Sequence, residues 1–135
     1  MENLFHNCVS LTSLDIKHFN TNKLINMRNM FSYCESLKSL DLSKIVTSNV
    51  INMNYLFWKC KSLTSINLTN LDTKKVEDFE GMFSECTSLK NIDLSNFDTT
   101  ITYNLINMFE DCTSLTSIDL SNFNFENQNL YNFFL

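Results

Sequence analysis

Hydrophobic residues recur along the chain with a fixed period of 26 residues. Phenylalanine, cysteine and leucine each hold one position of this repeat throughout: Phe5, Phe31, Phe57, Phe83 and Phe109; Cys8, Cys34, Cys60, Cys86 and Cys112; and Leu11, Leu37, Leu63, Leu89 and Leu115. The repeats follow one another without insertion or deletion, and 5 of the 135 residues remain at the end. Self-similarity at this length is typical of a solenoid, in which each repeat forms one coil.

Each repeat contains a short alternation that predicts a strand. In residues 34–59, Leu40 and Leu42 alternate with Ser39, Asp41 and Ser43, which is typical of a strand with one buried face. Strands one repeat apart cannot be joined by a hairpin and need a crossover connection. The sheet is therefore expected to be parallel.

A second pattern in the repeat predicts a helix. Val50, Met53, Phe57 and Cys60 recur at steps of three and four, which places them on one face of a helix. A threonine precedes this pattern in four repeats and is expected to cap the helix: Thr21, Thr47, Thr73 and Thr99.

One coil cannot bury its own apolar faces, whereas stacked coils form a continuous core. The sequence therefore predicts a single α/β leucine-rich-repeat solenoid over residues 1–135, made of five 26-residue coils. Its parallel sheet is expected on the concave side and its short helices on the convex side. We expect no caps, because the first and last residues carry the interior pattern.

The repeat also has a family resemblance. Residues 82–99 read Met-Phe-x-x-Cys-x-Ser-Leu-x-x-Ile-Asp-Leu-Ser-Asn-Phe-Asp-Thr, and the pattern covers essentially the whole chain. It closely resembles the BspA-like leucine-rich repeats, including the mycoplasma-type surface lipoprotein repeat of unknown function. The resemblance implies a module at the cell surface, or a secreted one, that serves adhesion or host contact. The 135 residues show no signal peptide or anchor.

Composition narrows the range of partners. The formal net charge is −5 at pH 7, which disfavours nucleic acid and anionic membranes as partners. No run of 18 apolar residues is present, so membrane insertion is not expected.

Few residues could carry chemistry. A single glycine, Gly81, leaves no glycine-rich phosphate loop, and the two histidines assemble no catalytic constellation. We expect no enzyme activity, cofactor or metal. The cysteines fit three interpretations: a metal site, a disulfide ladder or small reduced residues in the core. Their regular spacing at an apolar position favours the last.

A polar column crosses the outer face of the predicted sheet, formed by Asp15, Asp41, Asn67, Asp93 and Asp119. Neighbouring strands lie about 4.8 Å apart, so the carboxylates would repel one another. The column is either a ridge that binds a cation or a partner, or a solvated face whose side chains bond neighbouring backbone and serine groups.

An aromatic stretch in the third repeat is the other candidate site. Ile51, Tyr55 and Trp58 share one side of the predicted helix, and Tyr33 from the preceding repeat extends the patch. The alternative is that these side chains pack into grooves between neighbouring helices.

These observations predict a non-enzymatic interaction module whose partner is a protein or a glycan. The two alternatives are an intracellular protein–protein scaffold and a cation-binding structural module. Apolar residues at both ends predict either end-to-end self-association or a place within a longer array.

Overall fold

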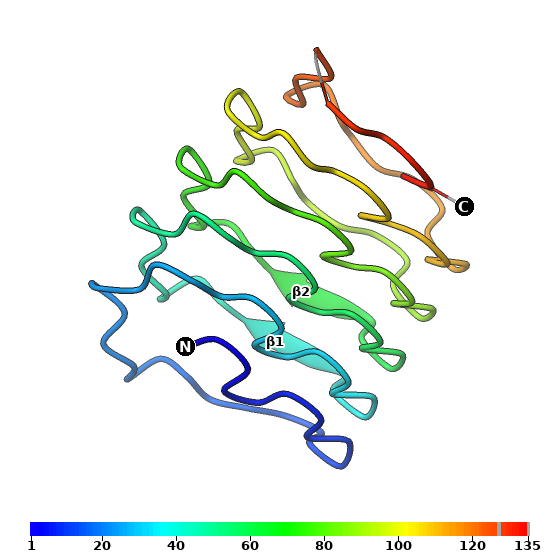
Figure 1. Ribbon diagram of the computed structural model, residues 1–135. Coiled ribbons are helices and arrows are strands. Elements are labelled where there is room, and N and C mark those ends of the chain that lie inside the picture. The colour runs from blue at the N-terminus through cyan, green and yellow to red at the C-terminus, as the bar shows by residue number, and fades with distance from the viewer. Residues whose placement is uncertain (127, 135) are drawn as a thin grey trace.

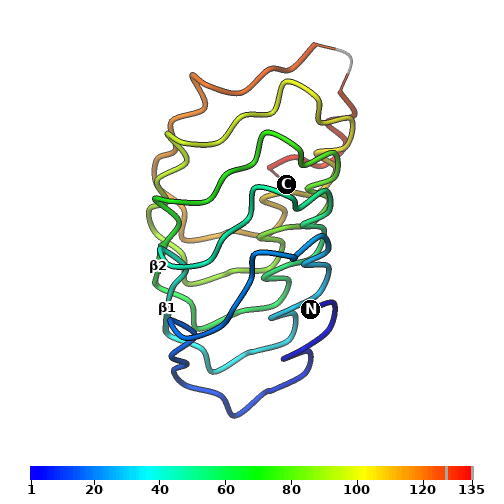
Figure 2. The ribbon, with the colours of Figure 1, turned by 90° about the vertical axis from the view of Figure 1, so that its left-hand side faces the viewer.

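The structure is a computed structural model that describes residues 1–126 and 128–134. The chain winds into coils that stack side by side, with its two ends at opposite ends of the stack (Figure 1). The view from the side shows each coil lying over the previous one around a common interior (Figure 2). This arrangement confirms a leucine-rich-repeat solenoid.

Strand pairing is parallel, as the crossover argument predicts. Strand β1 (Ser39–Asp41) pairs in parallel with β2 (Ser65–Asn67), with Ser39 opposite Ser65. Within β1, Leu40 is buried and its neighbours are exposed, which is the expected alternation. Isolated parallel bridges join other coils, among them Asn91 to Ser117.

The predicted helices are wrong. Residues 50–60 form extended backbone and turns, and no helix occurs in residues 1–126 or 128–134. Alternate backbone N–H groups of this stretch donate to the next coil, for example Phe57 N to Met82 O at 2.9 Å and Lys59 N to Ser84 O at 2.9 Å. The N–H groups of Leu56, Trp58 and Cys60 instead donate to the carbonyl oxygen three residues back and close tight turns. Val50, Met53, Phe57 and Cys60 still point inward and are fully buried.

Left-handed backbone explains why no helix forms. Two columns of residues have positive φ: Asn3, Asn29, Tyr55, Gly81, Asn107 and Asn132; and Asn7, Tyr33, Lys59, Glu85 and Asp111. A residue with φ near +55° interrupts a right-handed helix, and asparagine and glycine adopt this conformation most readily. The last step of the first column is 25 residues rather than 26, so the final coil is one residue shorter.

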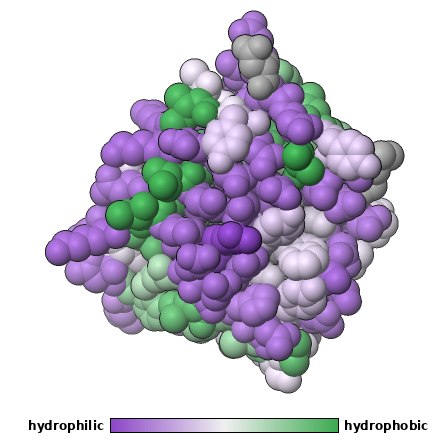
Figure 3. All heavy atoms as spheres, viewed as in Figure 1, coloured by the Kyte–Doolittle hydropathy of each residue, from purple (hydrophilic) through white to green (hydrophobic). Residues whose placement is uncertain are grey.

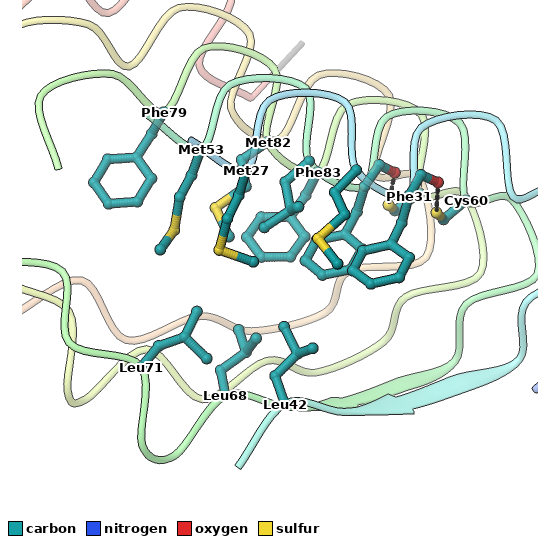
Figure 4. Close-up of a cluster of buried hydrophobic side chains, with 14 of the residues drawn as sticks. Met27, Phe31, Leu42, Met53, Cys60, Leu68, Leu71, Phe79, Met82 and Phe83 are labelled. Carbon is teal, nitrogen blue, oxygen red and sulfur yellow. Dashed lines mark hydrogen bonds between the residues drawn. The ribbon is translucent and has the colours of Figure 1, made fainter. Parts of the chain in front are cut away.

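The core consists of ladders of identical residues. Phe5, Phe31, Phe57, Phe83 and Phe109 stack with ring centroids 5.5–5.6 Å apart. Across the interior, Leu42, Leu68 and Leu71 face Met27 and Met53 (Figure 4). Removing one fully buried phenylalanine side chain from such a core costs about 3–5 kcal/mol.

The prediction that the repeated threonine caps a helix is also wrong. Thr47 Oγ1 donates to Asp72 O at 2.9 Å and accepts from Asp72 N at 2.8 Å. Thr73 repeats both bonds with Asp98. Each buried hydroxyl therefore joins its own coil to the next, which satisfies backbone groups that would otherwise be unpaired inside the protein.

Candidate interaction surface

Three aromatic side chains and a lysine gather on the outer side of the coils. Trp58 packs edge-on against Tyr33, with ring centroids 4.8 Å apart, and lies 5.3 Å from Tyr55. Lys59 Nζ sits 5.0 Å from the centroids of both Tyr33 and Trp58. All four residues are partly exposed. We refer to Tyr33, Tyr55, Trp58 and Lys59 as the aromatic cluster.

Two glutamates of the following coil hold the cluster in place. Glu85 Oε1 accepts from Trp58 Nε1 at 3.2 Å and lies 3.5 Å from Lys59 Nζ. Glu80 accepts a hydrogen bond from the Tyr55 hydroxyl. Burial first, and then Glu80, raise the pKa of Tyr55 well above its ordinary value. The tyrosine therefore remains a neutral donor throughout the physiological pH range.

Gly81 makes room for Tyr55. A Cβ atom at this position would lie 2.5 Å from Cε1 and 2.6 Å from Cδ1 of the Tyr55 ring. The backbone of Gly81 also has φ +56°. The only glycine of the chain is thus placed where an aromatic ring crosses the neighbouring coil.

Sequence reasoning found the aromatic residues of the cluster but not Lys59 or His6. His6 lies edge-on to Tyr33 at 5.6 Å and extends the row of rings toward the first coil. Tyr33 and Lys59 occupy the same position of successive repeats, and Tyr33 N donates to Trp58 O at 2.7 Å. Aligning the repeats, rather than drawing a helix face, would have placed these residues together.

Ile51 lies apart from the cluster. The sequence grouped it with Tyr55 and Trp58 on one helix face, but no helix is present to bring them together. Its neighbours are Ile25 and Glu77, because Ile51 N donates to Ile25 O and Glu77 N donates to Ile51 O, both at 2.9 Å. It lines a separate groove, described below.

The Asp/Asn column stays on the exposed face, and its side chains bond their own backbone. In each member, Oδ1 accepts from the N–H two residues further on, at 2.9–3.2 Å; the members are Asp15, Asp41, Asn67, Asp93 and Asp119. Such Asx turns stabilise a change of chain direction. This geometry matches the interpretation of a solvated face bonded to neighbouring backbone.

Repulsion within this column is outweighed by hydrogen bonds. Bonds from Ser43, Ser95 and Ser121 hold the pKa of Asp41, Asp93 and Asp119, respectively, below the ordinary value. At Asp119, the charge of Asp93 acts in the opposite direction and is the weakest of the contributions. In the described part of the chain, no group of three or more His, Cys, Asp or Glu side chains could hold a metal ion.

A second column of Asx turns was missed from the sequence. It comprises Asn26, Asn52, Asp78, Asn104 and Asn129, whose Oδ1 atoms accept from the N–H two residues further on at 2.8–3.1 Å. Asp78 is its only acid and is 7% exposed. Burial first, and the charge of Glu80 among lesser causes, raise the pKa of Asp78. The repeated asparagine one residue before Met27 and Met53 was the signal available in the sequence.

The cysteines form a ladder of thiols that donate to backbone. Cys34, Cys60 and Cys86 are buried and free, and their Sγ atoms lie 3.2 Å from the carbonyl oxygens of Phe5, Phe31 and Phe57, respectively. Cys112 makes the same contact with Phe83 at 3.1 Å, while Cys8 and Cys112 are only partly buried. The prediction that the cysteines are buried is confirmed for the three middle members of the ladder.

The sequence matches the family described as Mycoplasma protein of unknown function, DUF285, over residues 1–90 and again over 59–134. The chain belongs to this family. Membership confirms the resemblance to BspA-like repeats inferred from the repeat pattern. A comparison with curated proteins finds no match.

The fold is shared with a solved structure. A leucine-rich repeat protein of T. pallidum is 24% identical with a TM-score of 0.57, and the match covers 85% of this chain and 48% of that protein. A leucine-rich repeat protein from Bacteroides ovatus is 22% identical over 84% of this chain and 32% of its own, with a TM-score of 0.46. A leucine rich cell surface protein from Faecalibacterium prausnitzii is 20% identical over 68% of this chain and 28% of its own, with a TM-score of 0.40. The chain thus spans about half the length of the T. pallidum protein. Within residues 1–126 and 128–134, no helix is long and apolar enough to cross a membrane.

Proposed function

We propose that the chain is a non-enzymatic protein-binding module, and that it acts at the cell surface in adhesion or host contact. The aromatic cluster is the observation that carries the proposal. Tryptophan and tyrosine are among the residue types that contribute most energy to protein interfaces. The surface role rests on the resemblance to BspA-like repeats.

The cluster is preorganised for binding. Trp58 and Tyr55 are fixed by hydrogen bonds to Glu85 and Glu80, and Tyr33 is packed against Trp58. A partner therefore meets rings whose conformational entropy has already been lost on folding, which lowers the cost of association. Lys59 adds a positive charge to this apolar surface.

The decisive variant is Trp58→Ser. Serine occupies the equivalent position in two other coils, Ser32 and Ser84, where it is buried. The variant should therefore fold and lose only about 1–2 kcal/mol of stability, because it removes edge-on ring contacts at the surface rather than a core aromatic. A loss of about 3 kcal/mol or more would show that Trp58 is core packing and would end the assignment.

Binding is tested with a photo-crosslinking residue at position 6, next to Tyr33, and at position 90, an exposed control. Each protein is incubated with intact host cells and, separately, with an extract of the organism that produces the chain. Adducts from position 6 that disappear with Trp58→Ser support the cluster. Equal adducts from both positions, or adducts that survive Trp58→Ser, contradict it.

The same experiment distinguishes a role at the cell surface from a role as an intracellular scaffold. Adducts with proteins of intact host cells support adhesion. Adducts confined to the extract of the producing organism support the intracellular scaffold. A protein partner rather than a glycan is favoured because the cluster combines ring edges with a charged pair, Lys59 and Glu85, at 3.5 Å.

A further inference from the structure

A groove on a different part of the surface combines two isoleucines with two lysines. It has a volume of about 510 Å³ and is lined by Asn22, Lys23, Ile25, Asn49, Ile51 and Lys75. Ile25 and Ile51 are 56% and 44% exposed. We refer to these six residues as the apolar–basic groove.

The groove lies beside the turns at 22–23, 48–49 and 74–75. These turns follow one another along the left-hand side of Figure 1, and hydrophobic surface gathers on that side in Figure 3, separated by hydrophilic residues. Ile51 lies directly beside Ile25 of the preceding coil, because the Ile51 N–H donates to the Ile25 carbonyl oxygen with an N–O distance of 2.9 Å. The two side chains therefore form one apolar floor.

Two lysines, Lys23 and Lys75, flank the apolar surface formed by Ile25 and Ile51. Neither Lys23 nor Lys75 forms an ion pair within the part of the chain that the structure describes. Lys75 Nζ donates instead to Asn49 Oδ1 at 2.9 Å, which holds it at the edge of the groove. Glu77 follows Ile51 in the next coil but does not line the groove. The result is a locally basic, apolar site on a chain of net charge −5.

We propose that the apolar–basic groove binds an extended acidic peptide segment of a partner protein, with aliphatic side chains on Ile25 and Ile51 and carboxylates on Lys23 and Lys75. Lys23 and Lys75 lie two coils apart, or about 10 Å at the spacing of parallel strands. A peptide in the extended polyproline II conformation has about three residues per turn and rises about 3.1 Å per residue, so two carboxylates three residues apart lie on the same side of it, about 9 Å apart. The matching sequence is an acid, two aliphatic residues and a second acid.

An anionic membrane is the competing occupant. It would present the same charge, but the whole chain is acidic and would be repelled from a negatively charged bilayer at long range. A groove only two isoleucines wide also offers little apolar area to a bilayer. The peptide is therefore the occupant to which the charge and size of the groove point.

The test uses a fluorescent peptide with the central sequence Glu-Leu-Leu-Glu and fluorescence anisotropy. We expect a Kd of about 10–100 μM that weakens with added salt. Matched peptides with Gln-Leu-Leu-Gln and with Glu-Ser-Ser-Glu should each bind at least about fivefold more weakly, because each lacks one half of the recognition. Absence of binding at about 1 mM peptide would overturn the proposal.

Protein variants come from the repeat itself. Ile51→Glu introduces the residue type that the next coil carries at the equivalent position, Glu77. Lys75→Asn introduces the residue type that the preceding coil carries at the equivalent position, Asn49. Each should weaken binding of the Glu-Leu-Leu-Glu peptide about tenfold, whereas Lys90→Thr, at an exposed residue that does not line the groove, should leave binding unchanged. If Ile51→Glu and Lys75→Asn bound the peptide as tightly as the unsubstituted protein does, the peptide would bind elsewhere and the proposal would be overturned.

A second experiment tests the membrane as occupant. Co-sedimentation of the protein with phosphatidylglycerol vesicles, without peptide binding, would overturn the proposal in favour of a membrane. None of these variants touches the aromatic cluster, so a failure here is separable from a failure of the proposed function.

Discussion

At the scale of single residues, Gly81 shows how a neighbouring coil restricts the choice of amino acid. Its backbone has φ +56°, and a Cβ atom there would meet the Tyr55 ring at 2.5 Å. Asparagine fills the same position in other coils, at Asn29 and Asn107, because it tolerates positive φ. Glycine is needed in this coil alone because the preceding coil carries a tyrosine.

Gly81→Ala should lower the free energy of unfolding by about 2–4 kcal/mol, from left-handed strain together with the clash. Chemical denaturation measures this loss. In a Tyr55→Asn background the clash is absent, and the same substitution should cost only the strain of about 1–2 kcal/mol. Equal costs in both backgrounds would show that the Tyr55 ring does not restrict position 81.

Asp78 is a second residue whose neighbours set its behaviour. Asn54 Nδ2 donates to Asp78 Oδ2 at 2.8 Å, and Asn54 Oδ1 is buried without a hydrogen-bond partner in the described part of the chain. The charge of Glu80 adds to burial in raising the pKa of Asp78, while Arg28 acts against both. The folded state therefore disfavours ionised Asp78.

Asp78→Asn should stabilise the protein at neutral pH by about 1 kcal/mol, because the buried charge is removed. Rotation of the Asn54 amide would then direct its unpaired Oδ1 toward the new Nδ2. A carboxyl with a raised folded-state pKa costs stability above that pKa, and the cost is lost as pH falls through it toward the unfolded value. The advantage of the variant should accordingly shrink on acidification, as followed by thermal unfolding at a series of pH values. A constant difference across this range would contradict the assignment.

At the scale of the repeat, the sequence determined which residues face inward but not the backbone path between them. Val50, Met53, Phe57 and Cys60 are buried, as the three-and-four spacing predicts. That spacing is also satisfied by a series of turns with left-handed residues, and the two backbones bury the same side chains. The recurrent asparagines at 3, 29 and 107 were the signal for turns. The helix prediction missed them because it considered the apolar positions alone.

The cysteine column allows a test at this scale. Burial raises the pKa of Cys34 to about 11 and that of Cys112 to about 12, and it also raises the pKa of Cys60 and Cys86. Since the thiolate is the reactive form, these four thiols should be labelled slowly by Ellman's reagent at pH 8 in the native protein. Cys8, partly exposed in the first coil, should react first. Rapid labelling of all the cysteines without denaturant would contradict the buried ladder.

At the scale of the whole molecule, repetition explains both what was predictable and what was not. The stack and its parallel pairing follow from the 26-residue period, since every coil must present the same faces to its neighbours. The aromatic cluster arises where one coil departs from the others, as at Trp58, and the apolar–basic groove where two neighbouring coils share an isoleucine that the next coil replaces with Glu77. The positions of such departures are visible in the sequence, but which of them meet depends on the path of the coils. The cluster joins Tyr33 to Lys59, whereas Ile51 turns out to pair with Ile25.

The two ends of the described stack are complementary to each other. Each coil donates N–H groups to the next, as Phe5 N does to Met30 O and Phe109 N to Phe133 O. Within the described residues, Leu4 O in the first coil and Phe134 N in the last are unpaired members of this ladder. Phe134 stacks on Phe109 at 5.7 Å and is 53% exposed, and Leu4 is 48% exposed. A second copy placed head-to-tail would continue both the hydrogen bonds and the ring stack.

We therefore expect the isolated 135-residue polypeptide to self-associate end to end, in an open series rather than a closed dimer, because the two contacting surfaces differ. Sedimentation velocity should show a sedimentation coefficient that rises continuously over about a hundredfold range of protein concentration. Phe134→Ser with Tyr131→Ser removes exposed rings at one end only and should abolish the rise while leaving the core ladder intact. Lys90→Thr serves as a surface control and should behave like the parent chain. A sedimentation coefficient that stays at the monomer value throughout would show that the open ends do not suffice for association.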